Sequence, residues 1–331
     1  MAGRRRKKSG GRSYAWRYRG RIVACVFVEV IIICALVIMI GWNKGVKEWF
    51  EQFEQPVLKE VDISGINSPN AILMQARGGK ILGEINGEAQ IYPASMTKIM
   101  TVILGIENFD DLDEKITLTD EMFTGLYEQD ATQAGFQPGE EVRVIDLLYG
   151  AMLPSGAECC IALADTISGS EADFAELMNK KARKLGMENT HFCDSTGLHN
   201  PDHYSTVKDI AVLMKYCIKN DTFREIVETS RHSTGVTNIH PDVITYYSTM
   251  FKNLSDPTVT GGKILGGKTG YTSEAGHCLV SFAEIEGREY IFVSAGASGA
   301  DGNTIPHIQD AVTVYNRVGA AIEAKMNDNN K

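Results

Sequence analysis

Residues 92–108 read YPASMTKIMTVILGIEN and place a serine directly before a long apolar stretch. The apolar positions recur at helical spacing, so we predict a helix that begins at or near Ser95. Lys98 follows one helical turn later, and the two side chains therefore share a face. A serine hydroxyl becomes an effective nucleophile when a neighbouring base takes its proton. The pair is a candidate nucleophile and general base.

Lys98 can serve as that base only in its neutral form. Lowering the pKa of a lysine from about 10.4 to near 7 costs roughly 4 kcal/mol, which burial and a nearby cation can supply. The neighbouring Met96, Ile99 and Met100 are apolar and suit a buried lysine. We therefore expect a second basic residue from a distant part of the chain.

The sequence GGKTG at residues 266–270 lies on a predicted strand and contains such a residue, Lys268. Glycines in a strand permit the close approach of another backbone. A substrate peptide could add along this strand edge and place its terminal carboxylate against Lys268 and Thr269. The charge of Lys268 would also favour the neutral form of Lys98.

Strand patterns occur at both ends of the sequence. Two apolar runs at residues 71–76 and 81–85 flank a Gly-Gly turn and predict a hairpin. Three further strands and a final helix are predicted at residues 263–272, 278–285, 290–297 and 308–325. Helical patterns fill the middle of the chain. This order indicates one α+β domain, in which the first hairpin completes the sheet of the last three strands.

The Ser-x-x-Lys pattern occurs a second time, at Ser205 and Lys208. Here Ser205 or Thr206 suits the N-cap of a helix, with Asp209 in its first turn. We interpret this second copy as structural.

The N-terminal region carries the pattern of a membrane anchor. Residues 1–21 contain nine basic residues and no acidic one, and residues 22–42 are apolar except for Glu29. A bilayer-spanning helix needs about 20 apolar residues, and basic residues before it favour a cytoplasmic N-terminus. We therefore expect a retained single-pass anchor in the cell membrane, with the rest of the chain outside the cytoplasm.

Pro154-Ser155-Gly156 lies between the two lysine-containing motifs. The three motifs, in this order, resemble those of the penicillin-binding D-alanyl-D-alanine carboxypeptidases, which are low-molecular-mass serine peptidases related to the serine β-lactamases. The stretches PASMTKIMT, QPGEEVRVIDLLYGAMLPSG, GLHNPDHYSTVKDIAVLM and GGKTGYT extend the resemblance over about residues 70–300. It implies a central antiparallel sheet with helices on both faces and a helical subdomain.

The resemblance also implies an activity and its catalytic residues. The substrate would be a peptidoglycan stem peptide ending in D-Ala-D-Ala, and β-lactam antibiotics would be covalent inhibitors. Ser95 would attack the carbonyl of the penultimate D-alanine, with Lys98 as general base. Ser155 would relay a proton to the leaving D-alanine.

The same resemblance implies a substrate-binding strand that contains Gly270. Lys268 and Thr269 would hold the terminal carboxylate. The backbone N–H groups of Ser95 and Tyr271 would form an oxyanion hole, which is usually the largest electrostatic contribution to such catalysis.

The middle motif departs from the Ser-x-Asn pattern of the family, because Ala157 stands where the asparagine is expected. Losing one hydrogen bond costs about 0.5–1.5 kcal/mol, roughly a 3- to 10-fold effect. Glu158 could compensate if its side chain pointed inward, but we expect it on a solvated helix face.

Only about 30 residues follow Ala300, and their ending, AKMNDNNK, is too polar for an anchor. We therefore expect no β-rich second domain and no C-terminal anchor of the kind that many relatives carry. The expected organisation is a basic cytoplasmic tail at 1–21, a membrane span at 22–42, a stalk at 43–65 and a serine peptidase domain at 66–325.

Three alternatives stay open at this point. Ala157 allows a catalytically weak penicillin-binding or sensory protein, and Glu176 with Asn179 superficially offers the deacylating group of a class A β-lactamase. A zinc peptidase would need ligands such as His199 and His203, but the chain has no H-E-x-x-H or C-x-x-C pattern. We expect no metal, no cofactor and no nucleic-acid partner, since the basic tail is explained by the adjacent membrane span.

Overall fold

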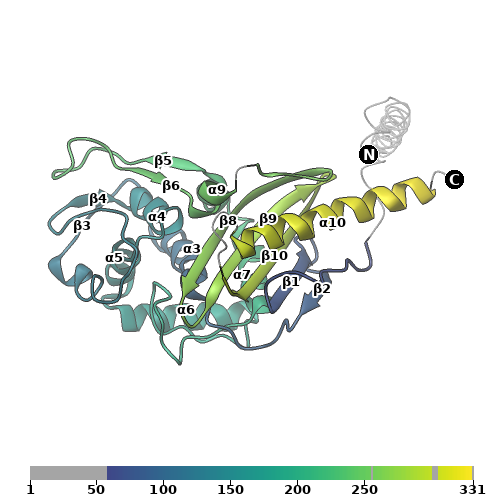
Figure 1. Ribbon diagram of the computed structural model, residues 1–331. Helices are drawn as coiled ribbons and strands as arrows, with labels where there is room; N and C mark the ends of the chain where they lie inside the picture. Colours follow the sequence, from purple (N-terminus) through teal and green to yellow (C-terminus); the bar gives the residue numbers. More distant parts are fainter. Residues whose placement is uncertain (1–57, 255, 300–304, 330–331) are drawn as a thin grey trace, which may run out of the picture. The chain divides into compact units, whose positions relative to one another are not determined.

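The computed structural model describes residues 58–254, 256–299 and 305–329 (Figure 1). These residues belong to one compact unit, Val57–Lys331. The predicted tail and membrane span lie outside the described residues, as does most of the predicted stalk. Among the helices that are described, none is long and apolar enough to cross a bilayer.

The compact unit begins earlier than the predicted boundary at residue 66. Leu58, Val61 and Ile63 are buried in the core. The backbone N–H of Val61 donates to the carbonyl of Leu82 at 2.7 Å. The end of the expected stalk is therefore part of the folded domain, because its apolar side chains find a hydrophobic surface to cover.

A six-stranded antiparallel sheet forms the centre, in the order β2-β1-β10-β9-β8-β7. Its strands are β1 (Asn70–Gln75), β2 (Ile81–Ile85), β7 (Thr258–Val259), β8 (Gly262–Thr272), β9 (Gly276–Ile285) and β10 (Arg288–Ala297). β1 pairs with β10 from Asn70 opposite Ala295 to Gln75 opposite Tyr290. The first hairpin therefore completes the sheet of the last strands, and this prediction is confirmed.

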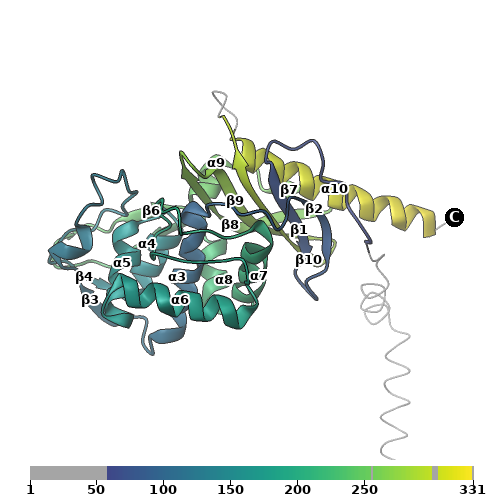
Figure 2. The same ribbon diagram turned by 90° about the horizontal axis from the view of Figure 1, so that it is seen from below.

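Both faces of the sheet are covered by helices. Alternate side chains of a strand point to opposite faces. On β1, Ile72 faces a core that it shares with α3 (Lys98–Asn108), α7 (Val207–Cys217) and α8 (Asp221–Glu228). Leu73 joins a second core with α10 (Pro306–Asn329), which lies across the other face in Figures 1 and 2. The predicted α+β architecture with two covered faces is confirmed.

The helical subdomain lies at one end of the sheet (Figure 2). It contains α4 (Val144–Met152), α5 (Ala157–Ser168) and α6 (Glu171–Leu185), with the short turn η2 (Asp120–Phe123) and the strand pairs β3 (Lys115–Thr117) with β4 (Glu141–Arg143) and β5 (Arg231–Ser233) with β6 (Thr245–Tyr247). A five-residue helix, α9 (Thr249–Asn253), connects β6 to the sheet.

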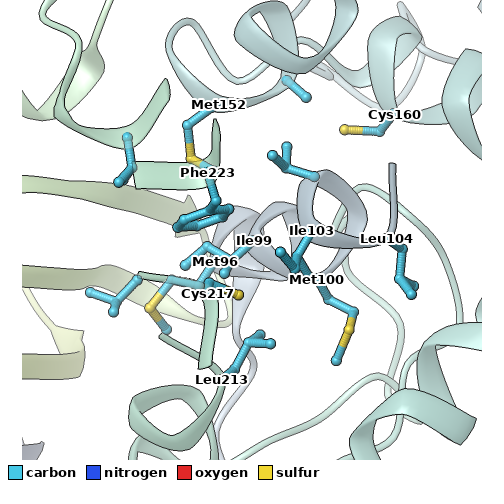
Figure 3. Close-up of a cluster of buried hydrophobic side chains, with 14 of the residues drawn as sticks. Met96, Ile99, Met100, Ile103, Leu104, Met152, Cys160, Leu213, Cys217 and Phe223 are labelled. Carbon is cyan, nitrogen blue, oxygen red and sulfur yellow. The ribbon is translucent and has the colours of Figure 1, made fainter. Parts of the chain in front are cut away.

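Helix α3 runs between the sheet and the subdomain, and the first eight of its eleven residues are buried. Figure 3 shows Ile99, Met100 and Ile103 of this helix within a cluster that also contains Leu213 and Phe223. Apolar packing on all sides holds such a helix in one position. The helix is therefore a rigid platform for the residues at its start.

Candidate active site

The predicted nucleophile, Ser95, lies in the 3₁₀ turn η1 (Ala94–Thr97) that leads directly into α3. The Nζ atom of Lys98 donates a hydrogen bond to its Oγ at 3.1 Å. Ala94, the residue before Ser95, has φ +47°, which is sparsely populated for a residue with a Cβ. Such strain tends to occur where a surrounding structure holds a functional residue in place.

Lys98 is only 3% exposed. Burial lowers its pKa, while the negative charges that Cys160, Asp194 and Glu158 can carry oppose this shift. Its Nζ also donates to the backbone carbonyl of Thr196 at 2.6 Å. The structure therefore places an amine with weakened affinity for its proton next to the Ser95 hydroxyl.

The second basic residue expected near Lys98 is Lys268, which is 1% exposed. Burial, reinforced by the charge of Lys98, lowers the pKa of Lys268 to about 7. Its Nζ donates to the carbonyl of Thr269 at 3.0 Å. The charge of Lys98 thus opposes the protonation of Lys268, and two adjacent buried lysines are harder to protonate together than one alone.

A cavity of about 630 Å³ opens in front of these residues. This volume is within the usual range for small-molecule sites. The predicted site residues that line it are Ser95, Lys98, Ser155, Thr269, Gly270 and Tyr271. Lys268 is not among the lining residues and lies buried beside them, so its contact with a carboxylate stays a prediction.

The strand β8 borders this cavity with an unpaired edge. In the described sheet, residues 268–272 pair with β9 on one side, whereas β7 pairs only with Gly262 and Lys263. A Cβ atom at Gly270 would lie 3.0 Å from the backbone nitrogen of Ser95. The absence of a side chain at this position therefore allows the β8 backbone to approach the turn that carries the serine.

Ser155 lies between α4 and α5, with φ +76°. Its Oγ is buried and has no hydrogen-bond partner in the described part of the chain. A buried polar atom without a partner costs free energy, so an unpaired hydroxyl at a cavity wall suits a group that binds a substrate or takes part in proton transfer.

The expectation that Glu158 lies on a solvated helix face is wrong, since its side chain is 0% exposed. One carboxylate oxygen accepts the backbone N–H groups of Ala134 at 2.6 Å and Gly135 at 2.9 Å. The loop that contains Ala134 and Gly135 covers the start of α5. The helical pattern of the sequence could not predict this contact. Glu158 does not line the cavity, and Ala157 leaves the position of the motif asparagine without a polar side chain.

The residues behind two alternatives do not converge on the cavity. Glu176 is exposed on α6, and the amide of Asn179 bonds to the backbone of Phe192. His199 lines the cavity, but the ring of His203 is buried against Thr97 and Asp194. No group of three metal-type side chains occurs among the residues that the structure describes.

Sequence reasoning missed several residues that contact the site. Thr196 accepts a hydrogen bond from Lys98, and the stacked rings of His277 and His307 lie 5.0 Å apart beside the cavity. These residues come from separate loops, strands and helices, and no short motif marks them. The only sequence signal for the turn at Thr196 was its place next to the family-like stretch that begins at Gly197.

The comparisons with known proteins agree with this fold and this arrangement of residues. Residues 57–299 match the family model described as D-alanyl-D-alanine carboxypeptidase, peptidase S11. The α+β fold and the Ser-x-x-Lys turn define the class of the protein as a serine peptidase of the penicillin-binding type. The chain belongs to the D-alanyl-D-alanine carboxypeptidase family.

Several relatives are named as D-alanyl-D-alanine carboxypeptidases. DacF of Bacillus subtilis (strain 168) is 36% identical over 231 residues, covering 69% of this chain and 57% of the relative. DacC of Escherichia coli (strain K12) is 33% identical, covering 72% and 58%. The chain therefore spans less than three fifths of the length of these two proteins. The enzyme of Streptomyces sp. (strain K15) is 34% identical, covering 69% and 78%.

Solved structures share the fold. The Streptomyces K15 DD-transpeptidase superposes with a TM-score of 0.70 at 30% identity, covering 79% of this chain and 100% of that chain. A D-alanyl-D-alanine carboxypeptidase from Mycobacterium tuberculosis H37Rv has a TM-score of 0.69 at 22% identity, covering 79% and 94%. This second likeness concerns the fold alone.

Proposed function

We propose that this protein is a serine-type D-alanyl-D-alanine carboxypeptidase. It removes the terminal D-alanine from peptidoglycan stem peptides through an acyl-enzyme on Ser95. The observation that carries the proposal is the buried Lys98 amine, 3.1 Å from the Ser95 hydroxyl at the cavity. Membership in the family supports the same reaction.

In the acylation step, neutral Lys98 takes the hydroxyl proton as Ser95 Oγ attacks the carbonyl of the penultimate D-alanine. The peptide adds along the open edge of β8. The oxyanion that forms accepts hydrogen bonds from the backbone N–H groups of Ser95 and Tyr271. The closeness of Gly270 to the Ser95 backbone supports this placement.

The C–N bond then breaks, and the amine of the leaving D-alanine takes the proton through Ser155. The hydroxyl of Thr269 binds the carboxylate of that D-alanine, while the neighbouring Lys268 contributes positive charge when it is protonated. Thr269 already shares a hydrogen bond of 2.7 Å with Thr249, which orients its hydroxyl. Water then attacks the acyl-enzyme ester, which restores Ser95 and releases the shortened peptide.

β-Lactam antibiotics acylate the same serine in this proposal. The apolar segment at residues 22–42 anchors the protein as a single membrane span with a cytoplasmic N-terminus. Its length of 21 residues and the nine basic residues before it support this orientation. The serine peptidase domain then faces the peptidoglycan outside the cytoplasm.

The two Ser-x-x-Lys serines provide a matched test. The full-length protein in detergent is incubated with a labelled penicillin and, separately, with a peptide ending in D-Ala-D-Ala. We expect a covalent adduct and release of D-alanine from the wild type. The Ser95→Ala variant should lose both, and the Ser205→Ala variant should keep both.

An adduct that persists in Ser95→Ala would contradict the assignment of the nucleophile. Adduct formation without D-alanine release in the wild type would favour a sensory penicillin-binding protein. Rapid turnover of penicillin would favour a β-lactamase.

A further inference from the structure

A turn at residues 194–197 lies against the base Lys98. One carboxylate oxygen of Asp194 accepts the backbone N–H of Thr196 at 2.8 Å and that of Gly197 at 2.6 Å. The same oxygen accepts the Thr196 hydroxyl at 2.8 Å. Three hydrogen bonds to one oxygen fix the turn in the conformation that directs the Thr196 carbonyl to the amine of Lys98.

The turn is packed directly onto the segment that carries the nucleophile. Gly197 has φ +78°, and a Cβ atom there would lie 1.9 Å from the carbonyl oxygen of Ala94 and 2.8 Å from the hydroxyl of Thr97. Only glycine fits at this position without moving the residues around Ser95. The position of the turn therefore determines the position of the η1 segment.

His203 connects the second oxygen of Asp194 to that segment. Its buried ring places Nδ1 3.1 Å from this oxygen and Nε2 2.9 Å from the hydroxyl of Thr97. Burial raises the pKa of Asp194, but hydrogen bonds from His203 and Thr196 outweigh it and hold the pKa at about 2. The backbone N–H of Cys193 also lies 3.2 Å from Nδ1 of His203. The ionised carboxylate of Asp194 favours the tautomer in which Nδ1 carries the proton and donates it to Asp194. In this tautomer Nε2 accepts the hydrogen bond of the Thr97 hydroxyl.

We propose that Asp194 and His203 are positioning residues for the general base. Asp194 holds the Thr196 carbonyl on Lys98, and His203 holds Thr97, the residue before Lys98. The inference rests on the proposed function, because it concerns the base of that reaction. In the described part of the chain, the side chain of Lys98 donates hydrogen bonds to the Ser95 hydroxyl and to the Thr196 carbonyl. The Thr196 carbonyl therefore orients the Lys98 amine, a role that the side chain of Ala157 cannot fill.

The charge of Asp194 also acts on the base. The other titratable groups around Lys98 are Lys268 on β8 and Glu158, Cys159 and Cys160 on α5. The carboxylate of Asp194 favours protonated Lys98, and burial opposes it. Replacing Asp194 by a neutral residue of the same shape should therefore lower the pKa of Lys98.

The test measures the rate of acylation by a labelled penicillin between pH 5 and 9, with the full-length protein. Asp194→Asn keeps an oxygen for the N–H groups of Thr196 and Gly197 but removes the charge. We expect the acidic limb of the pH–rate profile of this variant to move to lower pH, and the maximal acylation rate to fall about three- to tenfold. A purely structural defect would lower the plateau and leave the limb where it is.

Glu171→Gln is the matched control. Glu171 holds the same turn, since its carboxylate accepts the hydroxyl and the N–H of Ser195 at 2.5 and 3.2 Å. The largest charge effects on the pKa of Lys98 come from Cys160, Asp194, Glu158 and Cys159, and not from Glu171. Its acidic limb should stay with that of the wild type. An unshifted limb in Asp194→Asn, or an equal shift in both variants, would overturn the proposal.

A second pair of variants tests the hydrogen bond between His203 and Thr97, and it can be used even if Asp194→Asn fails to fold. Thr97→Val removes the hydroxyl at nearly constant volume and should lower the acylation rate about three- to tenfold, whereas Thr97→Ser should restore it. A wild-type rate in Thr97→Val would contradict the positioning role. Absence of acylation in the wild type would contradict the proposed function instead.

Discussion

The two copies of the Ser-x-x-Lys pattern occupy very different environments. Lys98 is buried, forms no ion pair with a carboxylate in the part of the chain that the structure describes, and has its pKa lowered mainly by burial. The side chain of Lys208 is 39% exposed and forms an ion pair with Glu88, which raises its pKa. The same four-residue pattern therefore produces a candidate base in one place and a charged surface residue in the other.

The serines differ in the same way. The hydroxyl of Ser95 accepts a hydrogen bond from its lysine at the cavity, whereas that of Ser205 is buried and bonds to Thr190 at 2.8 Å. Thr206 caps the helix α7 by accepting the N–H of Asp209 at 3.0 Å. The second copy is structural, as the sequence predicted, and the comparison shows that burial of the lysine distinguishes the two copies.

The largest expected effect comes from exchanging the two lysines for arginine. Lys98→Arg keeps a positive charge but cannot become neutral, so we expect acylation by penicillin to fall by at least about 10²-fold. Lys208→Arg should change it by less than about twofold, because the residue is a surface ion-pair partner. A time course of adduct formation measures both. Comparable losses in the two variants would erase the distinction between the sites.

The next largest effect concerns stability, because the burial of Lys268 at the site lowers the free energy of unfolding. Lys268→Met should raise the free energy of unfolding by about 1–4 kcal/mol while abolishing D-alanine release. Because the pKa of Lys268 is lowered to about 7, the native state binds fewer protons than the unfolded state above that pH. The gain in the free energy of unfolding should therefore be full below pH 7 and should shrink as the pH rises towards the ordinary lysine pKa.

Urea unfolding at pH 6 and pH 9 measures this dependence, with Lys263→Met as the control. Lys263 lies on the same strand with its side chain exposed, so its replacement should change stability by less than about 0.5 kcal/mol. A Lys268→Met variant that is less stable than the wild type at pH 6 would show that the buried lysine is well paired.

The smallest expected effect concerns the difference in the middle motif. Ala157→Asn should raise turnover of a D-Ala-D-Ala peptide about 3- to 10-fold, since it restores one hydrogen bond near Ser155 and Lys98. The measurement is the steady-state release of D-alanine. Unchanged turnover would mean that the hydrogen bond to the Thr196 carbonyl orients Lys98 fully, and that an asparagine at residue 157 adds nothing to it.

The prediction of the fold succeeded where local patterns are strong. The strands at residues 263–272, 278–285 and 290–297 and the turn at Glu286 lie where they were expected. The end of the stalk and the burial of Glu158 could not be predicted in the same way. Both depend on residues that are distant in the sequence and cover an otherwise exposed surface.

The sequence by itself determined the α+β class, the family and the residues of the three motifs, because these depend on periodicity and on the order of short patterns. The sequence also separated Ser95 from Ser205. Only the tertiary structure decided how Lys98 is buried and that Asp194, Thr196 and His203 surround it. The physical reason is that a pKa depends on solvent exclusion and on charges within a few ångströms, which are created when separate segments pack together.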